Sequence, residues 1–277
     1  MRIQRQHPMG SSGCIMEPVV YNNNGITIIN SDILNANIPN ESVDLIVTSP
    51  PYNAGMPYEP ILTEEEYFDF VSKVCGKLYV WLKPDGRFCI NICFNINRKQ
   101  EDKTLAMFPF LTWVDALRTN RLEIKSNVVW NQNYNDCDTA WGSYQSSSSP
   151  HIRCMTEYII VGYKKQWKKL NKGKSSINSE EFTTYTQDFW KFEAEHNRNH
   201  PAPFPEELPT RCLKLFSYVG DTILDPFMGS GTTLISAFKH KRKAIGVDIS
   251  KQYCDYAVNR LKMAGINGEA NFRRMFK

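Results

Sequence analysis

The sequence lacks an apolar run long enough to span a bilayer, for which about 20 apolar residues are needed, and it lacks a signal-peptide core near its start. Its eight cysteines include no Cys-x-x-Cys pair. Cys89 and Cys93 are four residues apart, but their stretch is typical of a strand and predicts no metal-binding face. These absences exclude a membrane protein, a disulfide framework and a zinc site, and they predict a cytoplasmic protein with reduced thiols.

A strong charge imbalance is also missing. The chain has 33 Lys and Arg residues against 29 Asp and Glu residues, a net charge of +4, which excludes a histone-like polycation. The basic residues cluster within 164–174 and 239–243, as suits a polyanion such as DNA, although a solvated surface is the alternative. With 277 residues, 42% of them hydrophobic, the chain can form one large α/β domain with insertions.

The first residues are polar and include the run Gly-Ser-Ser-Gly at 10–13. We expect 1–15 to be a disordered leader or a cloning remnant, and 16–277 to form a single domain. Thr63 and Glu66 have the spacing of a capping box at the start of a stretch with helical spacing. Strands are predicted at 26–29, 43–47, 87–92, 128–130, 158–161, 222–224 and 244–247, and helices at 64–81, 109–119, 206–216, 234–238 and 252–263.

The segments between these elements are predicted to be turns and loops. Residues 83–86 (Lys-Pro-Asp-Gly) are typical of a turn, and 95–104 and 164–186 are predicted to be irregular. Strands that alternate with helices predict a mostly parallel sheet with helices on both faces. Asp32, Ser49, Asp225 and Asp248 each lie at or just beyond a strand end, so we expect them along one edge of the sheet, where ligands bind in such folds.

A glycine turn joins the strand at 222–224 to an apolar helix. It contains Asp225, Gly229 and Gly231, and it offers a ligand close backbone approach and the free N–H groups of a helix start. The lysine of a P-loop is missing. Asp225 can pair with a ligand cation and Asp248 with a ribose diol, a combination that suits S-adenosylmethionine better than a dinucleotide. The alternative is that Asp225 and Thr232 only cap the helix.

Two turns of this chain resemble motifs of the DNA amino-methyltransferases. The run from Asp225 to Thr233 is similar to their cofactor motif, and Thr48-Ser-Pro-Pro-Tyr52 is similar to their catalytic motif. Here the catalytic motif comes first, which is the order of the β-class, circularly permuted members. The resemblance covers nearly all of 25–261 and implies a Rossmann-like methyltransferase fold with S-adenosyl-L-methionine as cofactor.

The resemblance also implies which residues bind the cofactor. Asp32 is expected beside the cofactor adenine, and the run His-Pro-Ala-Pro-Phe-Pro at 200–205 resembles the motif that precedes the glycine turn. The implied cofactor-binding residues are Asp32, His200, Pro203, Phe204, Asp225, Phe227, Gly229, Ser230, Gly231, Thr232 and Asp248. No metal is implied.

The catalytic turn suits methylation of an exocyclic amine, whose lone pair is delocalised into the base and is therefore a poor nucleophile. Acceptors for its N–H groups would help it attack, and we assign these to the Ser49 hydroxyl and the Pro50 carbonyl. Pro50 and Pro51 fix an extended backbone, and Tyr52 offers a ring on which a flipped base can stack. Positioning and electrostatics would supply the catalysis, with no covalent intermediate.

Ser49 also bears on the substrate. Family members with Ser at this position usually methylate cytosine N4, and those with Asp or Asn usually methylate adenine N6. We therefore predict a cytosine-N4 methyltransferase acting on double-stranded DNA by base flipping, within a restriction–modification system. A cognate restriction endonuclease and a second copy of the chain are expected partners. The alternatives are adenine-N6 methylation, a non-catalytic DNA-binding module and an RNA methyltransferase.

Two insertions are candidates for target recognition. The segment 131–150 contains Trp141, Tyr144 and several Asn and Gln side chains that can read base edges. Part of it resembles a segment common in the family, so the alternative is that it is structural or shapes the base pocket. The segment 164–186 offers lysines for phosphates. The loop at 95–104 is placed to close over a flipped base.

Overall fold

The computed structural model describes residues 19–55, 61–100, 103–132, 142–143, 145–150, 152, 154–193 and 205–266, with the backbone alone at 97–100 and 103–105. Several predictions fall outside these ranges. They concern the leader at 1–15, the aromatic residues Trp141 and Tyr144, and the cofactor-side residues His200, Pro203 and Phe204.

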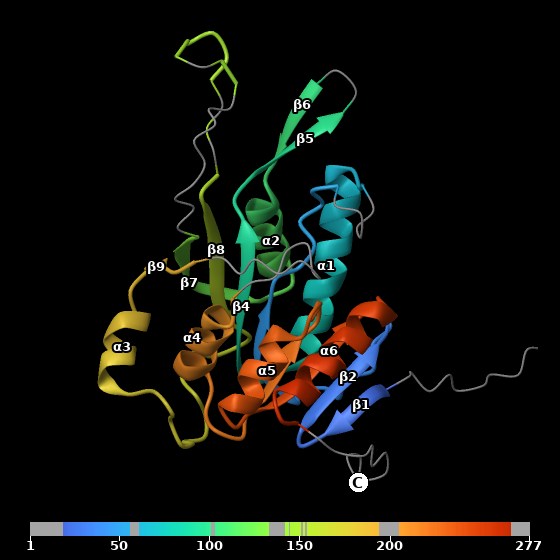
Figure 1. The fold of residues 1–277 in the computed structure, drawn as a ribbon, viewed down its shortest axis with the longest axis vertical. Helices are drawn as coiled ribbons and strands as arrows, with labels where there is room; N and C mark the ends of the chain where they lie inside the picture. Colours follow the sequence, from blue (N-terminus) through green and yellow to red (C-terminus); the bar gives the residue numbers. More distant parts are fainter. Residues whose placement is uncertain are drawn as a thin grey trace, which may run out of the picture.

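A nine-stranded sheet forms the centre of the molecule (Figure 1). Its strands β2, β11, β10, β3 and β4 run parallel, whereas β1 and β8 are antiparallel to their neighbours. In spatial order the strands are β1 (Val19–Asn23), β2 (Ile26–Asn30), β11 (Lys243–Asp248), β10 (Thr222–Asp225), β3 (Val43–Thr48), β4 (Leu82–Cys93), β8 (Thr156–Tyr163), β7 (Glu123–Asn131) and β9 (Phe189–Lys191).

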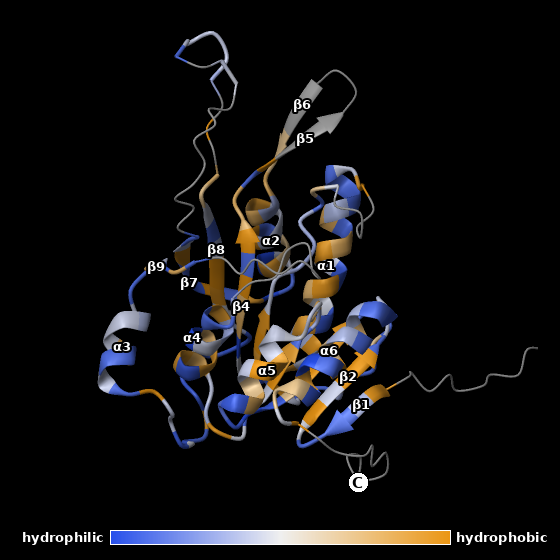
Figure 2. Ribbon diagram, in the orientation of Figure 1, coloured by the Kyte–Doolittle hydropathy of each residue, from blue (hydrophilic) through white to orange (hydrophobic). Residues whose placement is uncertain are grey.

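Helices cover both faces of this sheet, as the sequence predicts. On one face lie α1 (Glu64–Trp81) and α2 (Pro109–Thr119); on the other lie α4 (Glu207–Phe216), α5 (Thr232–Lys239) and α6 (Lys251–Met263). The central strand β3 is buried along its whole length, because Leu45 and Val47 pack toward the second group of helices and Ile46 toward the first. Figure 2 shows hydrophobic residues concentrated along these inner strands.

Helix α1 begins and ends where the sequence predicts. The amide of Glu66 donates to the Thr63 hydroxyl (3.2 Å), and the amide of Thr63 donates to the Glu66 carboxylate (2.8 Å), which completes the capping box. Tyr67, Val71 and Leu78 recur at helical spacing and are buried against the sheet. The helix is thus positioned by its cap and by one apolar face.

The chain order places a topological switch point between β10 and β3. These strands are hydrogen-bonded neighbours, with Leu224 opposite Ile46. The helix after β3 lies on one face of the sheet, and the helix after β10 lies on the other. The two turns that follow these strands therefore meet at the carboxyl edge of the sheet, where the helices diverge.

The structure differs from the sequence-based predictions at four places, apart from the short strand β9, which the sequence does not predict. Residues 83–86 lie within β4, where the pairing register with β3 shifts between Val43 and Leu45, so the turn-forming residues are accommodated inside the strand. The segment 95–104 is not a loop: β5 (Ile96–Gln100) and β6 (Lys103–Met107) form a separate antiparallel ribbon that projects at the carboxyl edge (Figure 1). Such a ribbon lies outside the main sheet, so its strands need not show an apolar pattern.

The other two corrections concern short elements. Within 164–186 the helix α3 (Ser179–Tyr185) begins with a capping box between Asn178 and Glu181, a signal that is visible in the sequence. Strand β1 pairs with β2 through a turn in which Asn24 (φ 49°) and Gly25 (φ 80°) are left-handed. At the far end of the described chain, the Tyr21 hydroxyl donates to the Ile266 carbonyl (3.2 Å), which joins β1 to the segment after α6.

Of the helices that the structure describes, none is both long and apolar enough to pass through a membrane.

Candidate functional site

The polar residues at the strand ends line one edge of the sheet, and this prediction is confirmed. In spatial order they are Asp32 after β2, Asp248 at the end of β11, Asp225 at the end of β10, and Ser49 after β3. The turn that carries Asp32 is joined to its neighbour because the Ser31 amide donates to the Asp248 carbonyl (3.1 Å). The Asp32 carboxylate accepts from the Leu34 amide (2.9 Å), which fixes its own turn.

Asp225 is the most buried carboxylate of this edge. Its Oδ1 accepts from the Thr48 hydroxyl (2.7 Å) and from the Phe227 amide (3.2 Å). Its Oδ2 is buried and makes no hydrogen bond among the described residues, although the nearby Thr233 hydroxyl, itself without a partner there, lowers the pKa of this carboxyl. Burial raises the pKa of the Asp225 carboxyl to about 6. When it is ionised, the Asp225 carboxylate can accept a hydrogen bond from a cationic ligand through Oδ2.

The glycine turn is shaped by its conformation and by Asp248. Gly229 and Gly231 have φ of 47° and 78°, and a Cβ on Gly231 would lie 2.9 Å from the Ala257 Cβ, so this position has no room for a side chain. The Asp248 carboxylate accepts from the Gly229 amide (2.9 Å) and from the Ser250 amide (2.8 Å). Burial raises the pKa of the Asp248 carboxyl. Each oxygen keeps a second lone pair for a ligand hydroxyl.

Arg260 on α6 also holds the glycine turn in place, a role that the sequence does not predict. Its Nη1 donates to the Ser230 carbonyl (2.9 Å), the Ser230 hydroxyl (2.9 Å) and the Thr232 hydroxyl (3.0 Å). Ser230 and Thr232, both predicted to bind the cofactor, therefore direct their hydroxyls to this guanidinium. Phe227, which is also predicted to bind the cofactor, packs its ring near Phe70 of α1 (6.4 Å between ring centroids).

Replacing Arg260 with Met should loosen the glycine turn, because the hydrogen bonds that hold Ser230 and Thr232 are lost. We expect cofactor affinity to fall about 10-fold and the free energy of unfolding to fall by about 1–3 kcal/mol. Calorimetric titration and urea unfolding would measure the two effects. Lys262→Met on the same helix is the matched control, since Lys262 is exposed; equal affinities in both variants would contradict the role of Arg260.

The catalytic turn is anchored by residues of α1 and α2. The Tyr67 hydroxyl donates to the Pro51 carbonyl (2.9 Å) and accepts from the indole of Trp113 (3.2 Å). Asn53 adopts a left-handed conformation (φ 60°), and its side chain bonds both the amide and the carbonyl of Leu62 at 2.9 Å. These contacts hold the Pro-Pro backbone rigidly next to the end of β3.

A polar network extends from Ser49 into the sheet. The hydroxyls of Ser49 and Tyr52 are 2.8 Å apart, and the Tyr52 hydroxyl donates to the Glu157 carboxylate of β8 (3.1 Å). Asn91 of β4 donates to the same carboxylate oxygen and to the Tyr52 hydroxyl (3.2 Å), while Gln132 donates to the other oxygen (2.6 Å). Burial raises the pKa of Glu157, and it raises the pKa of Tyr52 well above its usual value.

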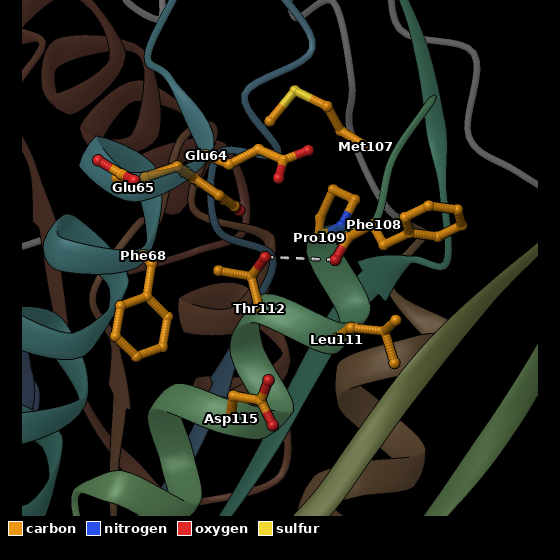
Figure 3. A pocket seen from close by; sticks show the side chains of 10 residues that line it. Glu64, Glu65, Phe68, Met107, Phe108, Pro109, Leu111, Thr112 and Asp115 are labelled. Atoms are coloured by element: carbon orange, nitrogen blue, oxygen red, sulfur yellow. Dashed lines mark hydrogen bonds between the residues drawn. The ribbon is translucent and has the colours of Figure 1, made fainter. Parts of the chain in front are cut away.

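A surface pocket lies beside this turn, between the first turns of α1 and α2 (Figure 3). Its volume is about 460 Å³, and it contains none of the predicted site residues, although Tyr67, which holds Pro51, is part of its wall. Glu64, Glu65 and Asp115 contribute carboxylates to it. This acidic lining disfavours a polyanion.

The lysines of 164–186 do not reach the candidate site. Strand β8 runs antiparallel to β4, so residue 164 follows it at the opposite edge of the sheet, and α3 also lies at that end (Figure 1). The ammonium of Lys164 is buried against Glu41 (2.9 Å), and that of Lys169 lies between Asp44 (3.8 Å) and Asp221 (3.9 Å). The prediction that these two lysines bind phosphates is wrong, because both ammonium groups are buried and already lie beside carboxylates of the same chain.

The segment 131–150 does start at the carboxyl edge, because β7 runs parallel to β4 and ends at Asn131. Its described part contains a turn in which the Ser143 amide donates to the Ser149 carbonyl (2.9 Å). The described residues 142–143 and 145–150 and the β5–β6 ribbon thus lie at the same end of the molecule as the catalytic turn (Figure 1).

The arrangement can bind a small cationic nucleoside and hold an amine beside it. Asp225 offers an unpaired buried oxygen to a cation, Asp248 offers lone pairs to a diol, and Ser49 lies on the neighbouring strand end. The Thr48 hydroxyl that bonds Asp225 immediately precedes Ser49 in the chain. The residues present therefore fit a sulfonium nucleoside with an amino-acid ammonium.

Comparison with known proteins agrees with this geometry. A family model described as DNA methylase matches residues 43–259, which include both turns. The type II methyltransferase M.MjaVI of Methanocaldococcus jannaschii is 40% identical over 178 residues, 63% of this chain and 89% of that protein. The DNA adenine methyltransferase YhdJ of Escherichia coli is 28% identical over 273 residues, 91% of this chain and 87% of that protein.

Among solved structures, the putative DNA modification methylase TTHA0409 of Thermus thermophilus, complexed with S-adenosyl-L-methionine, has a TM-score of 0.67 and 26% identity. The match covers 86% of this chain and 91% of that one. The overall fold of this chain therefore resembles that of a known methylase structure.

Proposed function

The chain belongs to the DNA methylase family, and we propose that it transfers a methyl group to the exocyclic N4 of cytosine in double-stranded DNA. It is a DNA amino-methyltransferase of the β class, and its cofactor is S-adenosyl-L-methionine. The observation that carries the finer assignment is the Ser49 hydroxyl at the end of β3, directly after the residue that bonds Asp225.

We assign the cofactor to the carboxyl ends of β2, β11 and β10, where Asp32, Asp248 and Asp225 lie. Asp225 would hold the ammonium through Oδ2, Asp248 would accept from the ribose hydroxyls, and Asp32 would lie beside the adenine. The glycine turn would approach closely because Gly229 and Gly231 carry no side chain. His200, Pro203 and Phe204 lie outside the described residues, and their binding of the cofactor stays a prediction. The bound cofactor supplies an electrophilic methyl group on a sulfonium.

The catalytic turn would prepare the amine for attack. The Ser49 hydroxyl accepts from one N–H group and the Pro50 carbonyl from the other, which draws the lone pair out of conjugation with the base. Tyr67 and Asn53 keep the turn rigid, so the acceptors need no reorganisation during the reaction. Tyr52 would support the flipped base through its ring.

Cytosine is the proposed base because the first motif residue is Ser49 and carries no carboxylate. Adenine N6 is the second candidate, since the similarity to the adenine methyltransferase YhdJ extends over 91% of this chain. The similarity to a type II methyltransferase supports a role in a restriction–modification system with a cognate endonuclease. The 131–150 segment and the β5–β6 ribbon are our candidates for contact with DNA.

Digestion of methylated DNA to nucleosides, followed by separation by mass, tests the proposal directly. We expect N4-methylcytosine after incubation of the protein with labelled cofactor and DNA of varied sequence. N6-methyladenine instead would replace the cytosine assignment with the second candidate. Absence of any labelled nucleoside, from protein that binds the cofactor, would rule out the transferase activity on these substrates.

A further inference from the structure

We infer that Glu157 receives the proton that the exocyclic amine releases on methylation, through a relay formed by the hydroxyls of Ser49 and Tyr52. The inference rests on the proposed function, because it requires the amine to lie at Ser49. It assigns a reaction step to a side chain of β8 that no sequence motif marks. It also gives the Tyr52 hydroxyl a role in proton transfer, separate from the stacking of the base on the Tyr52 ring.

The relay is continuous in the structure. The Ser49 Oγ lies 2.8 Å from the Tyr52 hydroxyl oxygen, which lies 3.1 Å from Glu157 Oε2. Both distances are within hydrogen-bond range. The elements that carry these groups are fixed independently: the catalytic turn by Tyr67 and Asn53, and Glu157 by pairing of β8 with β4, where it lies opposite Cys93.

The surrounding donors determine the direction of the relay. Asn91 and Gln132 present amide N–H groups to Glu157, so the carboxylate acts there as an acceptor. Tyr52 has a single hydroxyl proton and two acceptors for it, the Glu157 carboxylate (3.1 Å) and the Asn91 carbonyl (3.3 Å), of which the carboxylate is the nearer and the stronger. When Tyr52 donates to Glu157, its oxygen is left to accept from Ser49. Ser49 then donates inward, and its lone pairs are available to accept an N–H of the substrate.

Among the residues that the structure describes, none gives the charge of Glu157 a cationic partner. Its titratable neighbours are Tyr52 from the catalytic turn and Cys93 across the strand pair, and β7 leads to the neutral amide of Gln132. No salt bridge in the described part of the chain includes Glu157. Burial raises the pKa of this carboxyl, so it binds a proton more readily than an exposed glutamate.

The chemical balance is complete with the methyl donor alone. The bond from N4 to the methyl carbon forms as the bond from that carbon to sulfur breaks, and the electron pair of the broken bond stays on sulfur. N4 becomes cationic and loses one proton to Ser49 Oγ, as Ser49 passes its own proton to Tyr52 and Tyr52 passes its own to Glu157. Glu157 ends as a neutral acid and returns its proton to water after the product leaves.

The inference is tested by the pH dependence of single-turnover transfer in Glu157→Gln. At saturating cofactor and DNA, the wild-type rate should fall on the acid side as Glu157 becomes protonated. The variant keeps the shape of the side chain but cannot accept the proton. We expect it to be about 100-fold slower at pH 7.5 and to lose the acid-side fall, with unchanged dissociation constants for both ligands.

Tyr52→Phe is the second variant, because it keeps the stacking ring and removes only the relay hydroxyl. It should lose the same acid-side fall. Glu181→Gln on α3 is the matched control, since it removes a carboxylate at the opposite edge and should keep the wild-type profile. A wild-type profile without an acid-side fall overturns the relay, as does an unchanged profile in both relay variants.

Failure of the relay is distinguishable from failure of the proposed function. If the wild-type protein produces N4-methylcytosine while the relay variants keep its rate and pH profile, the relay alone is wrong. If the wild-type protein transfers no methyl group to DNA, the proposed function is wrong, and the relay, which depends on it, is wrong as well. Should Glu157→Gln not fold, Tyr52→Phe and the wild-type profile still decide the question.

Discussion

Replacing Asp225 with Asn is expected to weaken S-adenosyl-L-methionine binding by about 100-fold or more, because the cofactor ammonium loses its buried carboxylate partner. The same change should stabilise the cofactor-free protein. Asp225 Oδ2 has no hydrogen-bond partner among the described residues, and burial raises the pKa of the carboxyl to about 6. Above that pH the charged carboxylate costs about 3 kcal/mol of folding free energy, which Asn avoids.

The sign of the pH dependence follows from this raised pKa. The stability of the cofactor-free wild type should decrease as pH rises from about 4 through 6, and the advantage of Asp225→Asn should appear only over that range and above it. Cofactor binding should tighten over the same interval, since the ammonium prefers the ionised carboxylate. Both trends should be absent in the variant.

Calorimetric titration and thermal unfolding at pH 5 and pH 7.5 would measure these effects. Asp255→Asn on α6 is the matched control, because that carboxylate is exposed and pairs with Lys251 (2.7 Å) at the surface. It should leave both the affinity and the pH trend unchanged. Wild-type affinity in Asp225→Asn would contradict the assignment of the ammonium to this residue.

Replacing Ser49 with Ala is expected to slow methyl transfer by about 100- to 1,000-fold while the cofactor dissociation constant stays the same. The loss corresponds to the removal of one preorganised acceptor from the reacting amine. It also cuts the path from the substrate to Tyr52, so the acid-side pH dependence should disappear together with the rate. Single-turnover transfer with labelled cofactor measures the first effect, and calorimetry verifies the second.

Ser42→Ala provides a control at the opposite edge of the sheet, where the hydroxyl donates to the Pro39 carbonyl (2.6 Å). It should transfer methyl groups at the wild-type rate. A Ser49→Ala variant with weakened cofactor binding would indicate that the turn supports the cofactor instead of the amine. An unchanged rate would remove Ser49 from the reaction altogether.

The sequence predicts the parts of the fold whose signals are local. Helix α1 is bounded by its capping box and by apolar residues at helical spacing, so both of its ends are predicted correctly. The glycine turn after β10 and the Ser-Pro-Pro turn after β3 are recognisable because each combines a strand end with residues of special backbone geometry. Their proximity follows from the parallel sheet, which the alternation of strands and helices already indicates.

The parts that the sequence does not reveal depend on partners far along the chain. Glu157 reaches the catalytic turn because β8 inserts antiparallel beside β4, a pairing for which no local pattern exists. The sequence places Lys164 in a run of basic residues and shows no partner for it. In the structure its ammonium donates hydrogen bonds to the Glu41 carboxylate and to the Leu82 carbonyl. Arg260 holds the glycine turn from a helix whose sequence gives no sign of that contact.

The contact between Tyr21 and Ile266 has a consequence for the order of the elements. It brings the first strand and the segment after the last helix together, so a short peptide could join them without disturbing the sheet. If the joined chain were opened between β9 and α4, the glycine turn would come first and the Ser-Pro-Pro turn later. Every strand would keep its neighbours. The same three-dimensional arrangement can thus carry either motif order, depending on the loop at which the backbone begins and ends.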